Sequence, residues 1–332
     1  MISKKLKKIM VTGAGGFIGS HLVERLLKDG YLVYALDIVE LEKCNNLKNV
    51  ISHKNFKYFR GDIRDKKFIE DFFIKDAEVI YHLASVVGVR YYMEDPLYLI
   101  DCIITGTKNI LELCIKNNTR ILFASTSEIY GKNKDIPWQE DADRVLGNPS
   151  IDRWSYSSSK ALIEHMLFGL HHKNKINFST VRFFNVYGPK QNPIYVVSQT
   201  IYRILRNESP DLYDGGNQNR CFTFIDDAIE GLILAGTMNN AIGEVFNIGN
   251  QIPTKIIDVI NIALELTSSN ISVNKVDTKE KYGSTYQDII HRIPDSSKAE
   301  LLLNWKAKTQ IKEGISNTIQ WIKSNPWYLN SI

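Results

Sequence analysis

Apolar and polar positions follow two different periodicities along the first half of the chain. Short apolar runs such as 9–11 and 31–37 are followed by longer segments such as 20–30, in which apolar residues recur at helical spacing. Short continuous runs predict buried strands, and the longer pattern predicts amphipathic helices. Their regular alternation indicates an α/β protein with a doubly wound parallel sheet and right-handed crossovers.

The alternation continues to about residue 188 and then loosens. Strands are expected at 9–11, 31–37, 55–62, 77–85, 119–127 and 176–188. Helices are expected between them at 20–30, 66–75, 95–114 and 154–172. Beyond this region we expect helices at 195–206, 256–266 and 314–324, a strand and a helix within 221–236, and a strand at 244–250. We therefore divide the chain into a sheet domain, 1–188, to which later segments return, and a smaller mixed α/β domain, 189–332.

The composition narrows the class of protein. The 332 residues are 44% hydrophobic and 23% charged, which is typical of a globular protein of one or two domains. The net charge of +4 is small and the lysines are dispersed, so no nucleic acid is expected as a partner. No run approaches the ~20 apolar residues that span a bilayer, and we expect neither a membrane partner nor a signal peptide. The four scattered cysteines form no C-x-x-C pair, which indicates reduced thiols, a cytoplasmic protein and no metal site.

Three glycines lie in VTGAGGFIGSHL, between the first predicted strand and helix. Gly13 suits the tight turn, Gly16 lets the backbone approach a pyrophosphate, and Gly19 lets the helix pack close to the strand. The helix N-terminus also offers free N–H groups to phosphates. Asp37 ends the next strand, where a carboxylate accepts hydrogen bonds from ribose hydroxyls and repels a 2′-phosphate. This pattern predicts NAD binding, and the alternative is a simple tight turn with an ordinary strand-end cap.

Tyr156 and Lys160 lie four residues apart near the start of a predicted helix, so their side chains share one face. A lysine ammonium favours the phenolate form of a nearby tyrosine, which can then act as a base. Thr126 ends the preceding strand, from which its hydroxyl can reach the same substrate hydroxyl. The three residues indicate a proton-transfer site beside a hydride acceptor. The alternative for the Tyr–Lys pair is two residues on a helix surface.

These motifs, together with VRFFNVYGP, resemble the extended short-chain dehydrogenase/reductase family of nucleotide-sugar epimerases, dehydratases and decarboxylases. RCFTFIDDAIEG and GEVFNIGN resemble the same family, so the resemblance covers nearly the whole chain. It implies a Rossmann-like α/β fold with a substrate domain, NAD as the cofactor and a nucleotide sugar, expected to be a UDP-sugar, as the substrate. It also implies a homodimer through a four-helix bundle, to which the helices containing 95–114 and 154–171 correspond.

The resemblance also implies roles for individual residues. The cofactor-binding set is Gly13, Gly16, Phe17, Ile18, Gly19, Asp37, Asp62, Ile63, Leu83, Ala84, Ser85, Tyr156, Lys160 and Phe183. The substrate-binding set is Arg90, Tyr92, Asn185, Arg220, Tyr286 and Arg292. The catalytic set is Thr126, Ser127, Glu128, Tyr156, Lys160 and Arg292. Within these sets, Arg90 either grips a substrate carboxylate or faces solvent.

The triplet Thr126-Ser127-Glu128 separates the reactions of the family, which all begin with oxidation at sugar carbon 4. Serine is a poor general acid, so a 4,6-dehydratase would lack its proton donor for the elimination of water. The triplet resembles that of UDP-glucuronate decarboxylases, in which Glu128 would relay a proton and Arg292 would act as an acid or contact the carboxylate. The alternatives are that Arg292 serves only the diphosphate, or that Glu128 and Arg292 form a structural ion pair.

We therefore expect decarboxylation of UDP-glucuronate to a UDP-4-keto-pentose or UDP-xylose. The rival reactions are those of a UDP-sugar 4-epimerase and, after it, a nucleotide-sugar 4,6-dehydratase. A non-enzymatic NAD-sensing protein on the same fold is a rival of another class. An intact Thr126–Tyr156–Lys160 set argues against it, because a sensor does not need proton-transfer residues.

Overall fold

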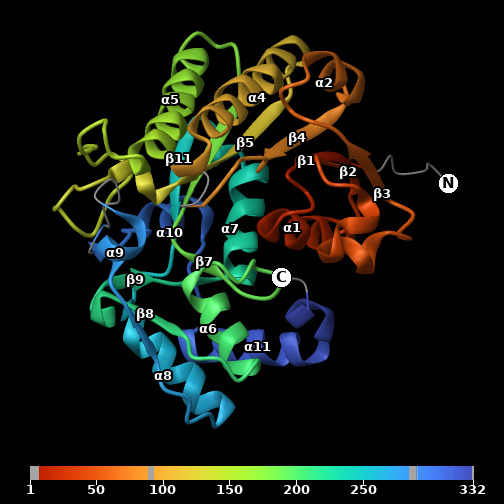
Figure 1. Ribbon diagram of the computed structural model, residues 1–332. Helices are drawn as coiled ribbons and strands as arrows, with labels where there is room; N and C mark the ends of the chain where they lie inside the picture. Colours follow the sequence, from red (N-terminus) through yellow and green to blue (C-terminus); the bar gives the residue numbers. More distant parts are fainter. Residues whose placement is uncertain (1–6, 89–92, 284–288, 290, 331–332) are drawn as a thin grey trace.

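The centre of the molecule is a seven-stranded parallel sheet in the order β11-β6-β5-β4-β1-β2-β3 (Figure 1). The computed structural model describes residues 7–88, 93–283, 289 and 291–330. The strands of the sheet are β1 Lys8–Thr12, β2 Leu32–Asp37, β3 Phe56–Arg60, β4 Ala77–His82, β5 Arg120–Thr126, β6 Phe178–Phe183 and β11 Glu244–Ile248. The strand order reverses between β1 and β4, and ligands of such sheets bind beyond the carboxyl ends of the strands at this point.

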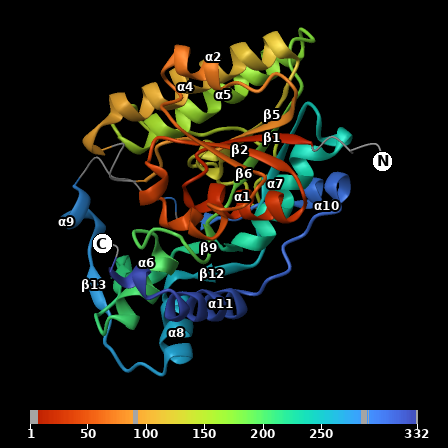
Figure 2. The same cartoon turned by 90° about the vertical axis from the view of Figure 1, so that its right-hand side faces the viewer.

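Helices cover both faces of the sheet, as Figure 2 shows. The helices on one face are α2 Lys66–Phe72, α4 Pro96–Asn117 and α5 Arg153–His171, and those on the other are α1 Phe17–Lys28, α7 Ile225–Thr237 and α10 Ser297–Leu303. Alternate residues of β1 serve the two cores: Ile9 and Val11 pack with α1 and α7, and Met10 packs with α2 and α4. Burial on both faces explains why these strands are continuous apolar runs in the sequence.

The remaining elements form a smaller α/β part beside the carboxyl ends of the strands (Figure 1). Its helices are α6 Val196–Leu205, α8 Ile256–Thr267, α9 Thr278–Tyr282 and α11 Ile311–Ser324. Its strands are β7 Val186–Tyr187, β8 Asp211–Tyr213, β9 Asn219–Cys221, β10 Thr223–Phe224, β12 Pro253–Lys255, β13 Asn274–Val276 and β14 His291–Arg292. They pair as β12-β9-β14, β13-β8 and β10-β7.

One predicted element differs from the structure. The single strand expected at 176–188 is wrong, because the chain breaks into β6 and β7 at Asn185, whose φ of 35° lies in the left-handed region. Asparagine tolerates that region better than most residues. The strand expected at 244–250 is β11, which pairs with β6 and completes the large sheet from the second half of the chain. The predicted division at residue 188 stays a prediction.

Within the described ranges, no helix combines the length and the apolar character that crossing a bilayer requires. The same part of the chain contains no group of three or more His, Cys, Asp or Glu side chains arranged to hold a metal ion.

The glycine turn brings β1, α1 and β4 into close contact. Gly13 has a φ of 72°, and a Cβ at this position would lie 2.8 Å from the backbone N of Ala84. A Cβ at Gly19 would lie only 2.0 Å from the carbonyl O of Gly13. Side chains cannot occupy either position unless the backbone moves. Glycine at these two positions therefore lets the backbone of the turn pack directly against the loop after β4 and against the start of α1.

We expect Gly19→Ala to push α1 away from β1, to destabilise the fold by about 1–3 kcal/mol, and to weaken NAD binding because the helix N-terminus moves. Urea unfolding and calorimetric titration with NAD measure the two effects. Gly169→Ala in α5 is the control, since a Cβ there meets no atom within 4 Å. The control should stabilise the helix by about 0.5–1 kcal/mol. Equal unfolding midpoints for the two variants would contradict the packing argument.

Candidate functional site

The N-terminus of α1 forms the floor of the predicted cofactor site. Its N-cap, Gly16, is extended and provides no side-chain cap, and the first turn carries no acidic residue. The first backbone N–H groups of the helix therefore remain available to an external anion, beside the positive end of the helix dipole. Phe17 and Ile18 follow the cap, and Gly19 packs against the turn. This arrangement suits a pyrophosphate.

Asp37 ends β2 beside this turn and is nearly buried, with 9% of its surface exposed. Its Oδ2 accepts a hydrogen bond from the N of Gly15 at 2.8 Å, and its Oδ1 accepts one from the N of Val39 at 3.2 Å. Asp37 is thus the strand-end cap that the sequence left as an alternative. A carboxylate has about four acceptor positions, so two hydrogen bonds leave capacity for ribose hydroxyls.

Asp62 and Ile63, which belong to the predicted cofactor-binding set, follow β3. Hydrogen bonds from Arg64 hold the Asp62 carboxylate, with Nη2–Oδ2 at 2.6 Å, and lower its pKa. Ile63 is buried against Gly106 of α4, where a Cβ would lie 2.3 Å from the Ile63 Cδ1. Arg64, which the sequence analysis did not single out, also lies 4.7 Å from the centre of the Tyr98 ring.

The loop after β4 contains Leu83, Ala84 and Ser85. The N of Leu83 donates to the O of Thr12 at 3.2 Å, and the N of Ala84 donates to the Thr12 Oγ1 at 3.2 Å. These bonds bring the predicted cofactor loop against the glycine turn, about 70 residues away in the sequence. Phe183 stands at the carboxyl end of β6, on the same edge of the sheet.

The three predicted proton-transfer residues meet where β5 ends and α5 begins. Thr126 is the last residue of β5, and its Oγ1 accepts from the N of Glu128 at 3.2 Å. Tyr156 and Lys160 lie in the first two turns of α5 and are 9% and 3% exposed. The Lys160 Nζ donates to the carbonyl O of Ala124 at 2.8 Å and lies 6.0 Å from the centre of the Tyr156 ring. The helical spacing therefore does place both side chains beside the strand.

Burial dominates the ionisation of this pair. It raises the pKa of Tyr156, and the negative charge of Glu128 adds to that rise, while a hydrogen bond with Thr126 and the charge of Arg292 oppose it. Burial also lowers the pKa of Lys160 to about 8. The sequence predicts that a nearby ammonium favours the phenolate of Tyr156, but desolvation of the phenolate has the larger effect on the pKa of Tyr156.

Glu128 lies between two arginines. Its carboxylate accepts from the Arg153 Nη2 at 2.6 Å and Nε at 2.8 Å, and from the Arg292 Nη1 at 3.0 Å. The Arg292 Nη2 also donates to the Ser127 Oγ at 2.5 Å. Burial opposes ionisation, but the charges of Arg153, Arg292 and Arg220 lower the pKa of Glu128 to about 2. The ion pair between Glu128 and Arg292, which the sequence offers as an alternative, is therefore present.

Arg153 is the site residue that the sequence analysis missed. It is the first residue of α5 and stands three residues before Tyr156, one helical turn away on the same face. Only 4% of its surface is exposed, so α5 begins with a buried arginine. The signal in the sequence was the charged residue at that spacing within DRWSYSSSK.

Two predicted substrate-binding residues are neighbours on two short paired strands. Arg220 of β9 and Arg292 of β14 are paired in register, and Arg220 is 8% exposed. Asn185, which belongs to the predicted substrate-binding set, donates from Nδ2 to the O of Cys221 at 3.4 Å. Arg90, Tyr92 and Tyr286 lie outside the described residues.

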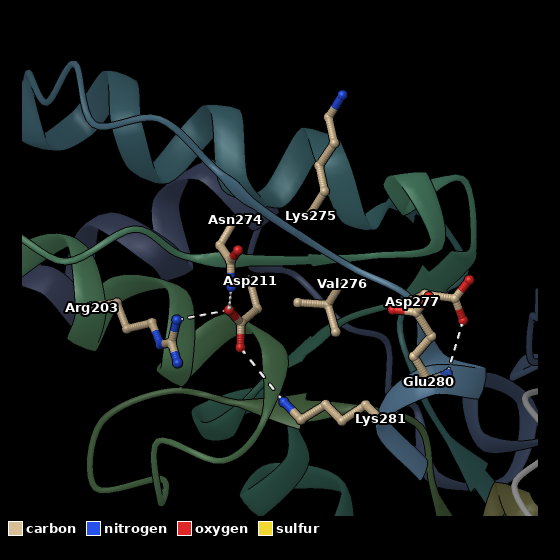
Figure 3. A pocket seen from close by; sticks show the side chains of 8 residues that line it. All are labelled: Arg203, Asp211, Asn274, Lys275, Val276, Asp277, Glu280 and Lys281. Carbon is tan, nitrogen blue, oxygen red and sulfur yellow. Dashed lines mark hydrogen bonds and ion pairs between the residues drawn. The ribbon is translucent and has the colours of Figure 1, made fainter. Parts of the chain in front are cut away.

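A separate hollow of about 450 Å³ lies between α6, β8, β13 and α9 (Figure 3). Its buried acid, Asp211, accepts hydrogen bonds from Arg203 and Asn274, each at 2.8 Å, and the Lys281 Nζ lies 3.8 Å from its other oxygen. None of the predicted site residues lines it. Asp211 is thus held by its own neighbours, and the predicted site residues lie elsewhere, at the edge of the large sheet.

Comparisons with known proteins identify the family of this chain. A family model described as GDP-mannose 4,6 dehydratase matches residues 10–318. A UDP-N-acetyl-alpha-D-glucosaminuronate decarboxylase of Bacillus cytotoxicus is 34% identical over 321 residues, covering 96% of this chain and 98% of the relative. The bifunctional polymyxin resistance protein ArnA of Wigglesworthia glossinidia brevipalpis is 33% identical over 97% of this chain, which spans only 52% of that relative.

A solved structure of UDP-glucuronic acid 4-epimerase from Bacillus cereus, in complex with UDP-glucuronic acid and NAD, has a TM-score of 0.83. It is 30% identical, and the match covers 96% of this chain and 99% of that one. The strand order and the cofactor turn define a dinucleotide-binding α/β protein. The chain belongs to the extended short-chain dehydrogenase/reductase family, in its GDP-mannose 4,6-dehydratase-like group of NAD-dependent nucleotide-sugar decarboxylases, epimerases and dehydratases. The family and the fold class predicted from the sequence are confirmed.

We expect Arg153→Met to destabilise the protein by about 1–3 kcal/mol, because Glu128 loses its bidentate partner. In the wild type the pKa of Glu128 is lowered from 4.5 to about 2, so its contribution to stability is present above pH 4.5 and is lost as pH falls toward 2. The variant has a higher Glu128 pKa, and its acid unfolding midpoint should therefore move to higher pH.

Near-ultraviolet circular dichroism during acid titration, together with urea unfolding at neutral pH, measures both effects. The control is Lys66→Met, which breaks the exposed pair of Lys66 with Glu112 and should change stability by about 1 kcal/mol or less. Superimposable acid titrations of the wild type and Arg153→Met would show that Arg153 does not set the ionisation of Glu128.

Proposed function

We propose that this protein decarboxylates UDP-glucuronate by transient oxidation at carbon 4. The observation that carries the proposal is the position of Arg292, held by Glu128 and Ser127 next to the predicted Thr126–Tyr156 pair. Its Nε is buried and has no acceptor among the described residues. A guanidinium with a spare buried donor suits a substrate carboxylate, which arginine binds through paired hydrogen bonds. The names of the relatives, which include a uronate decarboxylase and a uronate epimerase, support a uronate substrate.

The residues at the glycine turn fit NAD, and NAD is the cofactor bound in the Bacillus cereus relative. Gly13, Gly16 and the first N–H groups of α1 would hold the pyrophosphate, and Asp37 would accept from the ribose hydroxyls. When bound, NAD accepts the hydride from sugar carbon 4. Lys160 would donate to the nicotinamide ribose.

Tyr156 would remove the proton of the 4-hydroxyl as the hydride leaves carbon 4. Burial raises the pKa of Tyr156 and the charge of Arg292 opposes that rise. The ammonium of Lys160, 6.0 Å from the centre of the Tyr156 ring, would favour the phenolate further. Thr126 would donate a hydrogen bond to the same sugar oxygen. The product is a ketone beta to the carboxylate of carbon 5.

Such a keto acid loses carbon dioxide when the bond between carbon 5 and the carboxyl carbon breaks. The electron pair of that bond passes into an enolate on oxygen 4, which hydrogen bonds from Thr126 and Tyr156 would stabilise. A proton from water then adds to carbon 5 and gives the UDP-4-keto-pentose. Return of the hydride to carbon 4 would give UDP-xylose.

We assign Glu128 the task of holding Arg292. With its pKa lowered to about 2, Glu128 is ionised at neutral pH and carries no proton to give, so the relay role predicted from the sequence is not part of this proposal. The fixed carboxylate instead orients the guanidinium toward the substrate. Elimination of water is disfavoured, since Ser127 is a poor acid and its Oγ already accepts from Arg292.

A uronate 4-epimerase is the second candidate, favoured by the 30% identity to the Bacillus cereus enzyme. It would carry out the same oxidation and make the same carboxylate contact, but the bond between carbon 5 and the carboxyl carbon would stay intact.

We also propose a homodimer. Leu97 of α4 and Leu162 of α5 are 80% and 49% exposed, on two helices that pack side by side. The same pair from a second copy would cover these side chains in a four-helix bundle.

The function is tested with UDP-glucuronate labelled at the carboxyl carbon. We expect labelled carbon dioxide in an amount equal to the pentose product, identified by NMR. Tyr156→Phe keeps the packing of the ring and removes the proton acceptor, so it should lower the rate by about 10²–10⁴-fold. Formation of UDP-galacturonate without carbon dioxide would establish the 4-epimerase instead. The absence of turnover with any nucleotide sugar would support a sensor.

The cofactor preference is tested by calorimetric titration with NAD and NADP. We expect NAD to bind more tightly, because the Asp37 carboxylate repels a 2′-phosphate. Asp37→Asn keeps an acceptor for the ribose and for the backbone of Gly15 but removes the charge, so it should narrow the difference between the two cofactors. Glu78→Gln, at the amino end of β4, is the matched control and should leave the difference unchanged. Tighter binding of NADP by the wild type would refute the preference.

A further inference from the structure

A second buried ion pair, between Arg182 of β6 and Glu164 of α5, lies near the proton-transfer residues. The Arg182 Nη2 is 2.7 Å from the Glu164 Oε2, and the Arg182 Nε donates to the Glu164 Oε1 at 3.2 Å. The two side chains are 8% and 6% exposed. Removing two charges from water is costly, and an apolar pair of similar size is often as stable. The position of this pair therefore matters more than its contribution to stability.

Glu164 lies on the same face of α5 as Tyr156 and Lys160. The three residues are spaced by four, so they stand on successive turns of the helix. The Glu164 Oε1 accepts a hydrogen bond from the Ser125 Oγ at 2.5 Å. Ser125 directly precedes Thr126, and the Lys160 Nζ donates to the O of Ala124 one residue earlier. Two polar contacts thus fix α5 against the last three residues of β5.

Arg182 extends the network to the other end of the triplet. It lies on β6, and its Nη1 donates to the Tyr130 OH at 2.8 Å and to the O of Glu140 at 2.7 Å. The Tyr130 OH donates in turn to the Asn247 Oδ1 at 2.7 Å. Ser125 and Tyr130 bracket the triplet 126–128, so the ion pair holds the chain on both sides of it.

The same carboxylate acts on Lys160 through its charge. Burial lowers the Lys160 pKa to about 8, while Cys102 and the negative charge of Glu164 oppose that fall. The titratable groups that face Lys160 in the described residues are His82 on β4, Cys102 on α4, and Tyr156 and Glu164 on α5. Burial keeps His82 neutral, with a pKa of about 3, and raises the pKa of the Cys102 thiol. Glu164 is therefore the one carboxylate of this group.

We propose that Glu164 is a positioning residue of the proton-transfer site: its ion pair with Arg182 sets the register of α5 against β5 and keeps Lys160 charged beside Tyr156. The inference rests on the part of the proposed function that gives Tyr156 and Lys160 proton transfer. It does not depend on which sugar is the substrate, because oxidation at carbon 4 is common to the decarboxylases, epimerases and dehydratases of the family.

The test uses the double variant Glu164→Gln/Arg182→Met, which leaves no unpaired buried charge, beside the single variant Glu164→Gln. The oxidation step is followed in a single turnover as formation of the reduced cofactor, with any nucleotide sugar that the wild type oxidises. We expect the double variant to slow this step by about tenfold or more, with an unchanged KM. We also expect the alkaline limb of its pH profile to move to lower pH, because Lys160 loses its proton more easily without the Glu164 charge.

Calorimetric titration with NAD provides a readout that does not need turnover. The affinity of the double variant should fall more than that of the wild type between neutral and alkaline pH, since a neutral amine offers fewer donors than an ammonium. Glu112→Gln, an exposed carboxylate on α4, is the control and should match the wild type.

The proposal is overturned if the double variant keeps the wild-type rate and pH profile. It is also overturned if the rate falls only in proportion to the thermal stability with no shift of the alkaline limb, because Glu164 would then be purely structural. A wild type that oxidises a nucleotide sugar but releases no carbon dioxide from UDP-glucuronate would refute the proposed decarboxylation and leave this inference standing.

Discussion

Two guanidinium groups close on one carboxylate where α5, β14 and the end of β5 meet. The Glu128 side chain is 15% exposed, so it has lost most of its hydration and remains ionised through Arg153 and Arg292. Attraction between buried charges offsets such a loss only when the geometry is close. Arg292 lies 164 residues after Glu128, and its other N–H group fixes Ser127. The site is therefore complete only when the smaller part of the fold has docked on the sheet.

Burial also governs the ionisation of Tyr156 and Lys160, the predicted proton-transfer pair. It favours the neutral forms of both Tyr156 and Lys160, so each depends on neighbouring charges for its ionised form. Arg292 acts on Tyr156, and Glu164 acts on Lys160. These two charges belong to different ion pairs, Arg292 with Glu128 and Glu164 with Arg182. The ionisation of Tyr156 and Lys160 thus depends on charged residues outside the proton-transfer pair.

Long elements with their own periodicity could be predicted from the sequence, and short ones could not. Strands buried on both faces, such as β1 and β5, are continuous apolar runs bounded by polar turns. The strands β9 and β14 contain only three and two residues. Segments this short cannot show an alternation of apolar and polar residues. Both strands exist only because distant segments of the chain pair with them. The break between β6 and β7 was missed for a related reason, since Asn185 adopts a left-handed conformation inside an apolar run.

The sequence by itself determined what local spacing encodes: the glycine turn before α1, Asp37 at the end of β2, and Tyr156 and Lys160 on one helix face. These features need only a few neighbouring residues to form, so a pattern reveals them. Only the tertiary structure decided which charges meet, namely Arg153 and Arg292 on Glu128, and Arg182 on Glu164. It also decided the ionisation of Tyr156, since desolvation and the charges of distant segments set a pKa, and neither can be obtained from spacing along the chain.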